Sequence, residues 1–132
     1  MFSKILLLSL VVCTLNVVNA HADESGLLFE LRTYTANEGK LEALHSRFRD
    51  HTMGLFEKHG MKNIGYWIPV DKADTLTYLI AHKSQATVEA SWKAFVEDPV
   101  WKKVYTDSIA DGALVKKIDN SFMQATDYSP IR

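Results

Sequence analysis

Three residues that could take part in chemistry alternate along one short segment: Glu30, Arg32 and Tyr34. Alternate residues of a β-strand point to the same face, so we expect these side chains to lie side by side. A carboxylate and a guanidinium placed in this way can form an ion pair. The group is either an anchor for an anionic or carbonyl-bearing ligand, or a buried pair that fixes strand register and dimer geometry. We favour the structural interpretation, because buried charges are usually paired.

Two further residues are candidates for a ligand pocket. His51 lies at the edge of the apolar stripe of a predicted helix, where it could point into a cleft and act as a general base. Trp67 could form the wall of a pocket for a planar or apolar molecule. Because Tyr66 precedes Trp67 on a predicted strand, one ring is expected in the core and the other on the opposite side of the sheet. The alternative for these aromatic residues is an ordinary place in the core and the dimer interface.

The sequence gives no support for several common kinds of site. Four histidines of the predicted domain lack the spacing of metal ligands, so we expect no metal and no cofactor: His45, His51, His59 and His82. A Gly-rich phosphate loop and a Gly-x-Ser-x-Gly nucleophile motif are both missing from the sequence. The formal net charge is −1, so there is no basic excess to bind nucleic acid.

The first 22 residues are typical of a cleaved signal peptide. Lys4 precedes an apolar run, and Ala20-His21-Ala22 offers small residues at the spacing that a signal peptidase requires. Cleavage after Ala22 is expected, with Ala20 as the alternative site. The apolar run is short for a transmembrane helix, and a lipoprotein anchored at Cys13 is a weaker alternative. We therefore expect a secreted or periplasmic domain, residues 23–132, with no transmembrane segment and no cysteine.

Hydrophobic periodicity predicts the order strand, helix, strand, strand, helix pair, strand. The predicted strands cover residues 27–35, 62–70 and Thr75–His82, and a final strand is expected within residues 115–128, with 120–126 as the favoured part. A long helix is expected to begin with a capping box at Thr35 or a cap at Asn37, and to end at Gly60. Ser84 is expected to cap the second helix, and Asp98-Pro99 to begin the third.

This order predicts an α+β fold, the ferredoxin-like βαββαβ pattern, with an antiparallel sheet and helices on one face. We expect the open face to carry Glu30, Arg32, Tyr34 and several large apolar residues. A monomer would expose these residues to water. We therefore expect two sheets to pair in a homodimer.

Several motifs resemble those of the NIPSNAP family. They are Glu30-Leu31-Arg32-Thr33-Tyr34 with Gly39-Lys40, Leu55-Phe56-Glu57-Lys58-His59-Gly60-Met61, Trp92 with Phe95 and Asp98-Pro99-Val100-Trp101, and Ala125-Thr126-Asp127-Tyr128-Ser129-Pro130. The resemblance covers nearly the whole predicted domain and implies a dimeric α/β barrel of ferredoxin-like halves. The chain departs from a common family form at Asn37-Glu38-Gly39, where a proline often precedes the glycine. The mitochondrial association of animal members is not expected of an exported chain.

Two functions follow as hypotheses. The first is an exported homodimeric module that binds a small apolar or carbonyl ligand, or a protein partner. The second is a cofactor-free oxygenase or isomerase, by analogy with other dimeric α/β barrels. That enzyme would use Arg32 and Tyr34 to orient the substrate, His51 as base and Trp67 as pocket wall. His51 within hydrogen-bond reach of Arg32 or Tyr34 would favour the enzyme; haem binding is the weakest alternative.

Overall fold

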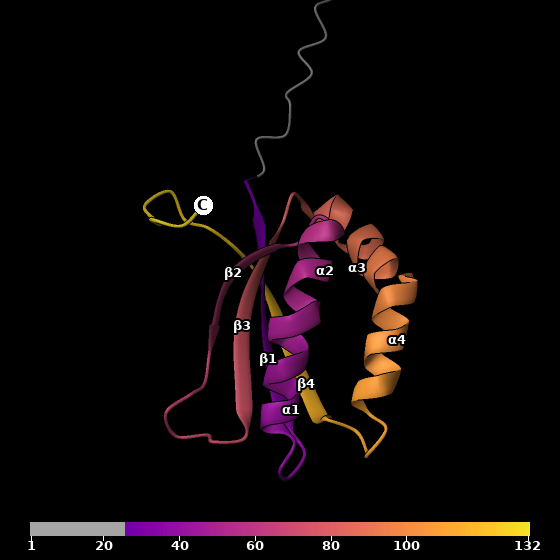
Figure 1. Ribbon diagram of the computed structural model, residues 1–132. Coiled ribbons are helices and arrows are strands. Elements are labelled where there is room, and N and C mark those ends of the chain that lie inside the picture. Colours follow the sequence, from indigo (N-terminus) through magenta and orange to yellow (C-terminus); the bar gives the residue numbers. More distant parts are fainter. Residues whose placement is uncertain (1–25) are drawn as a thin grey trace, which may run out of the picture.

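Four antiparallel strands form a sheet with helices against one of its faces (Figure 1). The strands are β1 (Leu28–Ala36), β2 (Lys62–Trp67), β3 (Thr75–His82) and β4 (Val115–Gln124), in the order β2-β3-β1-β4. This computed structural model describes residues 26–132, and the predicted signal peptide, its cleavage sites and Cys13 lie outside them. The helices follow β1 and β3, so the predicted ferredoxin-like α+β pattern is confirmed.

The first helical segment is continuous but not uniform. It consists of α1 (Leu41–Arg47), a π-helical turn η1 (Phe48–Thr52) and α2 (Met53–Lys58). The π-turn inserts an extra residue, and the Thr52 hydroxyl donates to the carbonyl of Arg47 across it at 3.2 Å. The segment ends at Gly60, whose φ of +80° is the left-handed conformation that favours glycine. The predicted glycine stop is therefore confirmed.

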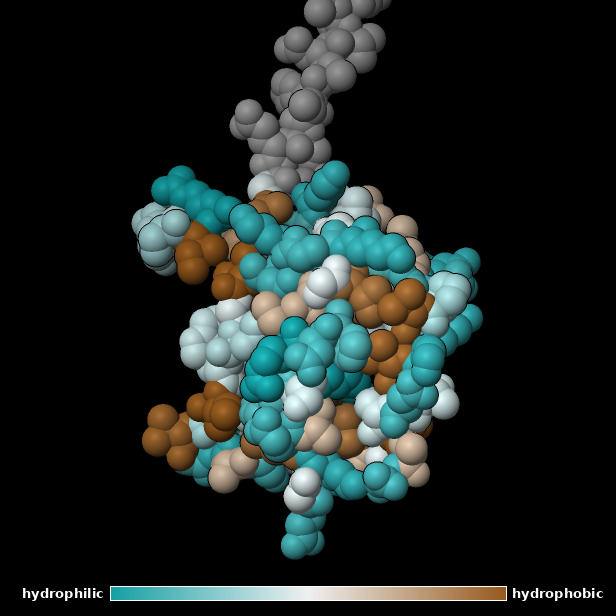
Figure 2. Space-filling view, in the orientation of Figure 1, coloured by the Kyte–Doolittle hydropathy of each residue, from teal (hydrophilic) through white to brown (hydrophobic). Residues whose placement is uncertain are grey.

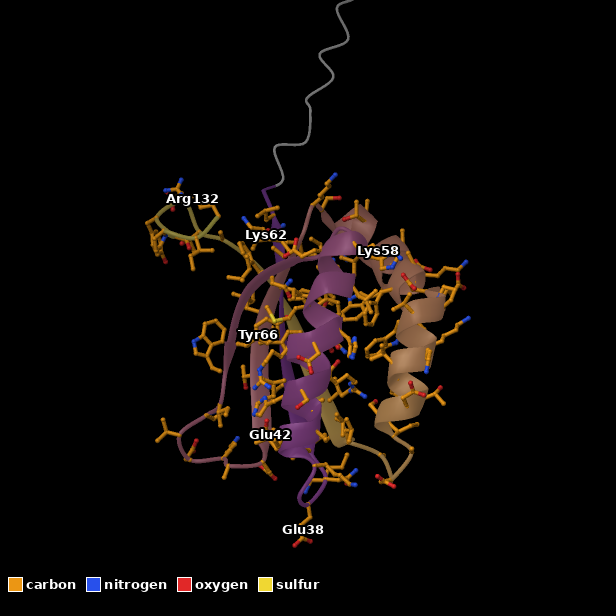
Figure 3. The ribbon with its side chains drawn as sticks, in the orientation of Figure 1. Glu38, Glu42, Lys58, Lys62, Tyr66 and Arg132 are labelled. Carbon is orange, nitrogen blue, oxygen red and sulfur yellow. The ribbon has the colours of Figure 1, made fainter. Side chains whose placement is uncertain are left out.

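The predicted start of this segment is wrong. Strand β1 continues to Ala36, so Thr35 pairs with β3 and β4 and cannot form a capping box. The side-chain amide of Asn37 donates to the carbonyl of Ala113 at 2.8 Å instead of capping the helix. Lys40 occupies the N-cap position without a side-chain hydrogen bond. Figure 3 shows the turn between β1 and α1, with Glu38 projecting into solvent.

The second helical segment comprises η2 (Gln85–Thr87), α3 (Val88–Glu97) and α4 (Pro99–Ser108). Ser84 is the N-cap residue of this segment, as predicted. Asp98 separates α3 from α4, and its Oδ1 accepts from the N–H of Val100 at 2.8 Å, which confirms the predicted N-cap. Its Oδ2 lies 2.7 Å from both Lys58 Nζ and His59 Nε2. These hydrogen bonds lower the pKa of Asp98 and join the end of α2 to the helix pair.

Two strands differ from their predicted bounds. Strand β2 ends at Trp67 rather than at residue 70. Strand β4 lies within the predicted range 115–128, but it begins at Val115, earlier than the favoured 120–126. The first half of β4 reads Val-Lys-Lys-Ile-Asp, which lacks the apolar alternation of a half-buried strand. As an edge strand it is exposed along nearly its whole length. Pairing with β1, rather than burial, holds this part of the chain in the sheet.

Aromatic rings fill the space between the sheet and the helices. Phe48 and Phe56 lie 5.0 and 6.0 Å from Tyr78 of β3, measured between ring centroids. Phe95 of α3 lies 4.9 Å from Phe56. Tyr66 stacks on Tyr78 at 5.2 Å, which puts it on the helix side. Each fully buried ring of this kind contributes about 1.5–3 kcal/mol through removal from water, so this cluster is the main source of stability.

The expected orientation of β1 is wrong. Glu30, Arg32 and Tyr34 do not lie on the open face; they point toward the helices, where Trp92 of α3 contacts both Glu30 and Arg32. Both faces of β1 carry apolar residues, so alternation alone could not assign them. The polar residues are accepted on the covered face because they form hydrogen bonds with one another.

The open face of the sheet carries Trp67 and Met123, which are 53% and 39% exposed, beside Leu31 and Leu79. The C-terminal tail lies on the side of the sheet away from the helices (Figure 1), and residues Phe29, Leu79, Met123 and Ile131 line a groove there. Figure 2 shows apolar side chains projecting where the loop between β2 and β3 lies in Figure 1, and Ile68 and Val70 of that loop are exposed. Among the helices of residues 26–132, none has the length and apolarity needed to cross a membrane.

Candidate functional site

A cavity of about 500 Å³ lies between the sheet and helices α3 and α4. Residues of β1, η1 and both helices line it, together with the beginning of β4. Its apolar wall includes Phe48, Phe95, Trp101, Leu114 and Ile118. Its ionisable and hydroxyl-bearing lining residues are cations, tyrosines and a threonine: Arg32, Arg47, Lys116, Lys117, Tyr34, Tyr105 and Thr52. The cavity has the size and apolar lining of a small-molecule site.

Glu30 organises one end of this cavity without lining it. Its buried carboxylate is 2.6 Å from Arg32 Nη1, 2.8 Å from His82 Nε2 and 2.8 Å from Trp92 Nε1. The amide of Asn120 also donates to it at 3.2 Å. Burial alone would raise the pKa of Glu30, but the hydrogen bonds from His82, Arg32 and Trp92 lower it to about 2. Glu30 is therefore ionised and neutralises one cation of the site.

The guanidinium of Arg32 lies over an aromatic ring. Its guanidinium carbon lies 4.5 Å from the ring centroid of Trp92, and its Nη2 donates to the Tyr34 hydroxyl oxygen at 3.2 Å. Burial alone would lower the pKa of Arg32, but Tyr34, Tyr78 and Glu30 raise it overall. The Nε–H of Arg32 is buried and has no partner among residues 26–132. That N–H is a hydrogen-bond donor without an acceptor.

Tyr34 offers a second free donor beside Arg32. Its hydroxyl oxygen accepts from Arg32 and also from the hydroxyl of Tyr78 at 3.1 Å. Burial raises the pKa of Tyr78, so Tyr78 keeps the proton that it donates. Because both lone pairs of the Tyr34 oxygen are occupied, its own O–H can only donate. Tyr34 lines the cavity, so this donor is available to a bound oxygen atom.

Arg47 is a buried cation that forms no ion pair with a carboxylate of residues 26–132, although it also lines an outer groove that contains Asp50 and Asp107. Only 7% of the residue is exposed, and its guanidinium lies 5.4 Å and 5.5 Å from the ring centroids of Trp101 and Tyr105. Its Nη1 donates to the hydroxyl of Ser108 at 3.1 Å, while its buried Nε–H has no partner among residues 26–132. Of the ion pairs in this part of the chain, none includes Arg47. Burial lowers the pKa of Arg47, but an arginine keeps its charge in a protein.

The residues predicted from the sequence are only partly brought together. Glu30, Arg32 and Tyr34 form one connected group, and the predicted ion pair between Glu30 and Arg32 is confirmed at 2.6 Å. His51 is exposed and lines an outer groove between α1, η1 and α4, not the cavity of Arg32 and Tyr34. Trp67 lies on the opposite, open face, with its indole over Gly65. The four-residue pocket of the enzyme hypothesis is therefore not formed.

Sequence reasoning missed Arg47. The signal was present, because Arg47 follows the buried Leu44 by three residues and so lies on the stripe that faces the core. A charged residue on an apolar stripe of a helix is normally expected at the edge of that stripe, where it contacts solvent. Within residues 26–132, no group of three or more His, Cys, Asp or Glu side chains is placed to hold a metal ion. The chemistry of the cavity is therefore that of hydrogen-bond donors and positive charge.

The fold places this chain in the class of ferredoxin-like α+β domains, and a putative antibiotic biosynthesis monooxygenase from Nitrosomonas europaea has a similar fold. That chain is 12% identical, has a TM-score of 0.58, and the match covers 83% of this chain and 97% of the other. The NIPSNAP family model matches residues 29–130, and the chain belongs to the NIPSNAP family. This confirms the resemblance found in the sequence motifs.

Solved structures of the same family share the fold. A NIPSNAP family protein of unknown function from Agrobacterium tumefaciens is 20% identical with a TM-score of 0.71, over 83% of this chain and 96% of that one. An uncharacterised NIPSNAP-like domain protein from Burkholderia xenovorans is 14% identical with a TM-score of 0.70, over 80% and 90%. No curated protein matches this sequence. At these identities the structural likeness establishes the fold alone.

Proposed function

We propose that this domain binds a small organic anion with an apolar body in the cavity between the sheet and helices α3 and α4. The observation that carries the proposal is Arg47, a buried cation that lines the cavity and has no carboxylate partner among residues 26–132. Arg32, a second cation of the lining whose side chain is 15% exposed, has its counterion in Glu30. Lys116 and Lys117, the remaining cations of the lining, are exposed and form ion pairs with Asp74 and Asp119. Among residues 26–132, Arg47 is therefore the one cation of the lining without a carboxylate partner, and an anionic ligand would balance its charge.

The physical argument rests on the cost of burying a charge. A buried ion without a partner destabilises a protein by several kcal/mol, roughly, after relaxation of its surroundings. Stacking on Trp101 and Tyr105 and one hydrogen bond to Ser108 offset part of this cost. An apolar residue of similar size at position 47 would avoid the cost altogether. A cation at position 47 is explained if an anionic ligand binds beside it during function.

The proposed module is an exported homodimer. Trp67, Met123, Leu31 and Leu79 form an apolar surface on the open face, which a second copy of the chain would cover. The signal-peptide pattern of residues 1–22 supports export to the periplasm or the exterior. Velocity sedimentation of residues 23–132 tests the dimer, and a monomer at micromolar concentration would refute it.

Isothermal titration with benzoate and longer aryl carboxylates tests the binding function. We expect binding by the wild type, and loss of at least about tenfold in affinity for Arg47→Gln, because hydrogen bonds to charged groups contribute about 1.5–3 kcal/mol. Arg49→Gln is the matched control, since Arg49 lies two residues away with its side chain 66% exposed. Equal affinity of the Arg47 and Arg49 variants would refute the proposal.

A cofactor-free oxygenase or isomerase is the second candidate. The observation that favours it is the pair of free donors on Arg32 and Tyr34, which could stabilise an enolate oxygen. The likeness to a putative monooxygenase is an analogy of fold only. Binding is the better supported function, because the polar side chains of the cavity are donors and cations rather than a base. Oxygen uptake with aryl ketones and phenols, measured for wild type and Tyr34→Phe, tests the enzyme.

A further inference from the structure

We infer that the ligand is a carboxylate whose flat apolar body carries a second, uncharged oxygen, with the carboxylate at Arg47 and the second oxygen between Arg32 and Tyr34. The inference rests on the proposed binding function and specifies the chemical class of the ligand. Each half of the ligand is assigned from a different part of the cavity.

The charges that line the cavity favour a ligand with one negative group rather than two. At the Arg47 end a guanidinium stands without a carboxylate among residues 26–132 and keeps a free Nε–H. At the other end the charge of Arg32 is already balanced by Glu30 at 2.6 Å. A second anion at Arg32 would lie near the buried carboxylate of Glu30, and among residues 26–132 the two lysines of the lining, Lys116 and Lys117, are already paired with Asp74 and Asp119. The net requirement is one carboxylate at the Arg47 end.

The Arg32 end selects an uncharged acceptor. It offers two donors that have no acceptor among residues 26–132: the Nε–H of Arg32, and the O–H of Tyr34, whose oxygen already accepts two hydrogen bonds. Both side chains line the cavity, and they are joined by the hydrogen bond from Arg32 Nη2 to the Tyr34 oxygen at 3.2 Å. A carbonyl oxygen has two lone pairs and could accept from both donors at once. A ketone, ester or amide oxygen therefore fits this end.

A row of aromatic rings joins the two ends. Trp92, on which Arg32 stacks, lies 5.7 Å from Phe95, and Phe95 lies 4.4 Å from Trp101, on which Arg47 stacks. The two guanidinium groups are therefore placed against different ends of one aromatic wall. A flat, apolar body lying along this wall would bring one polar group to each end. The cavity of about 500 Å³ is large enough for a substituted single ring.

The test compares three probes that differ by one group. Para-acetylbenzoate carries both groups, para-ethylbenzoate lacks the carbonyl, and para-ethylacetophenone lacks the carboxylate. Homologues of both acids with one or two methylene groups before the carboxylate cover different spacings between the ends. Each is titrated calorimetrically into residues 23–132, as the wild type, as Arg47→Gln, as Tyr34→Phe and as Tyr66→Phe. Tyr66 is the matched control, because its hydroxyl bonds to Asn63 outside the cavity.

We expect the keto acid of the best spacing to bind about tenfold tighter than the matching ethyl acid, and at least about tenfold tighter than the ketone. Tyr34→Phe is expected to reduce the ratio of keto-acid affinity to ethyl-acid affinity to about twofold or less, while Tyr66→Phe leaves that ratio unchanged.

Equal binding of keto and ethyl acids at every spacing, with Arg47 still required, would overturn the inference and leave anion binding standing. A ketone that binds as tightly as the keto acid would refute both. So would the failure of every acid to bind at about 10 mM.

Discussion

Replacement of Glu30 with glutamine tests whether the polar group beneath the cavity is as tightly satisfied as its geometry indicates. The carboxylate accepts hydrogen bonds from Arg32, His82, Trp92 and Asn120. A glutamine keeps one acceptor oxygen but turns an NH₂ group toward other donors, and it leaves the Arg32 charge unbalanced. Breaking a buried ion pair by removing one partner costs about 3–5 kcal/mol. We expect Glu30→Gln to lower the free energy of unfolding by that amount.

The pKa of Glu30 supplies a second route to the same magnitude. It falls from the ordinary 4.5 to about 2 in the folded protein, and at about 1.4 kcal/mol per pKa unit this corresponds to about 3 kcal/mol. Since the folded pKa is depressed, the stabilisation is complete above pH 4.5 and is lost as the pH falls toward 2. The stability difference between wild type and Glu30→Gln should therefore narrow over that range. Other carboxylates titrate in both proteins, so their effects cancel in the difference.

Urea unfolding followed by tryptophan fluorescence, at a series of pH values from neutral to about 2, measures this difference. Glu42→Gln is the matched control, because the Glu42 side chain is 80% exposed and its contact with Arg49 is 3.9 Å long. The control is expected to stay within about 0.5 kcal/mol of the wild type. A loss below about 1 kcal/mol for Glu30→Gln, or a difference that does not change with pH, would refute this account of the site.

Three further substitutions test the core and the open face. Leu44→Ala, at a position that is 0% exposed, should lower the free energy of unfolding by about 2–5 kcal/mol in urea titrations, and a smaller loss would mean that the helix packs loosely. Trp67→Lys should weaken dimerisation at least about tenfold, measured by sedimentation. Val100 is also 53% exposed but lies on α4, so Val100→Lys should leave dimerisation unchanged. Equal effects of the two substitutions would place the interface elsewhere. Gly65→Ala would put a Cβ atom 2.4 Å from the Trp67 ring. We therefore expect the Trp67 fluorescence spectrum to shift, while the free energy of unfolding falls by less than about 1 kcal/mol. An unshifted spectrum would show that the indole does not lie over Gly65.

Much of the fold could be predicted because the residues that begin and end its helices and strands act through local interactions. The β-branched and aromatic run Thr75–His82 forms a strand with the predicted bounds. Asp98 and Pro99 begin a helix by hydrogen bonding and by a fixed φ, neither of which depends on distant residues. Gly60 ends a helix because its φ of +80° costs other residues energy. Gly60 and Asp98-Pro99 also lie within the family motifs, whereas Thr75–His82 lies outside them.

The site could be predicted only in part, because it depends on which helices and side chains pack against each face of the sheet. Alternation placed Glu30, Arg32 and Tyr34 together, but it could not decide which face of β1 the helices cover. The role of Arg47 depends on the π-helical turn that follows it and on the rings of Trp101 and Tyr105, which lie more than fifty residues away in the sequence. His51 looked like a base from its residue type, yet its helix directs it to the outer groove.

Native mass spectrometry of residues 23–132, purified from the host's own secreted or periplasmic fraction, tests the binding function most directly. We predict a wild-type protein that carries a small organic acid at one molecule per chain, and an Arg47→Gln protein from the same fraction that carries none. Arg49→Gln should retain the acid. A wild-type protein that is recovered empty and stays empty when titrated with the aryl keto acids would contradict the account, as would an acid that Arg47→Gln retains equally well.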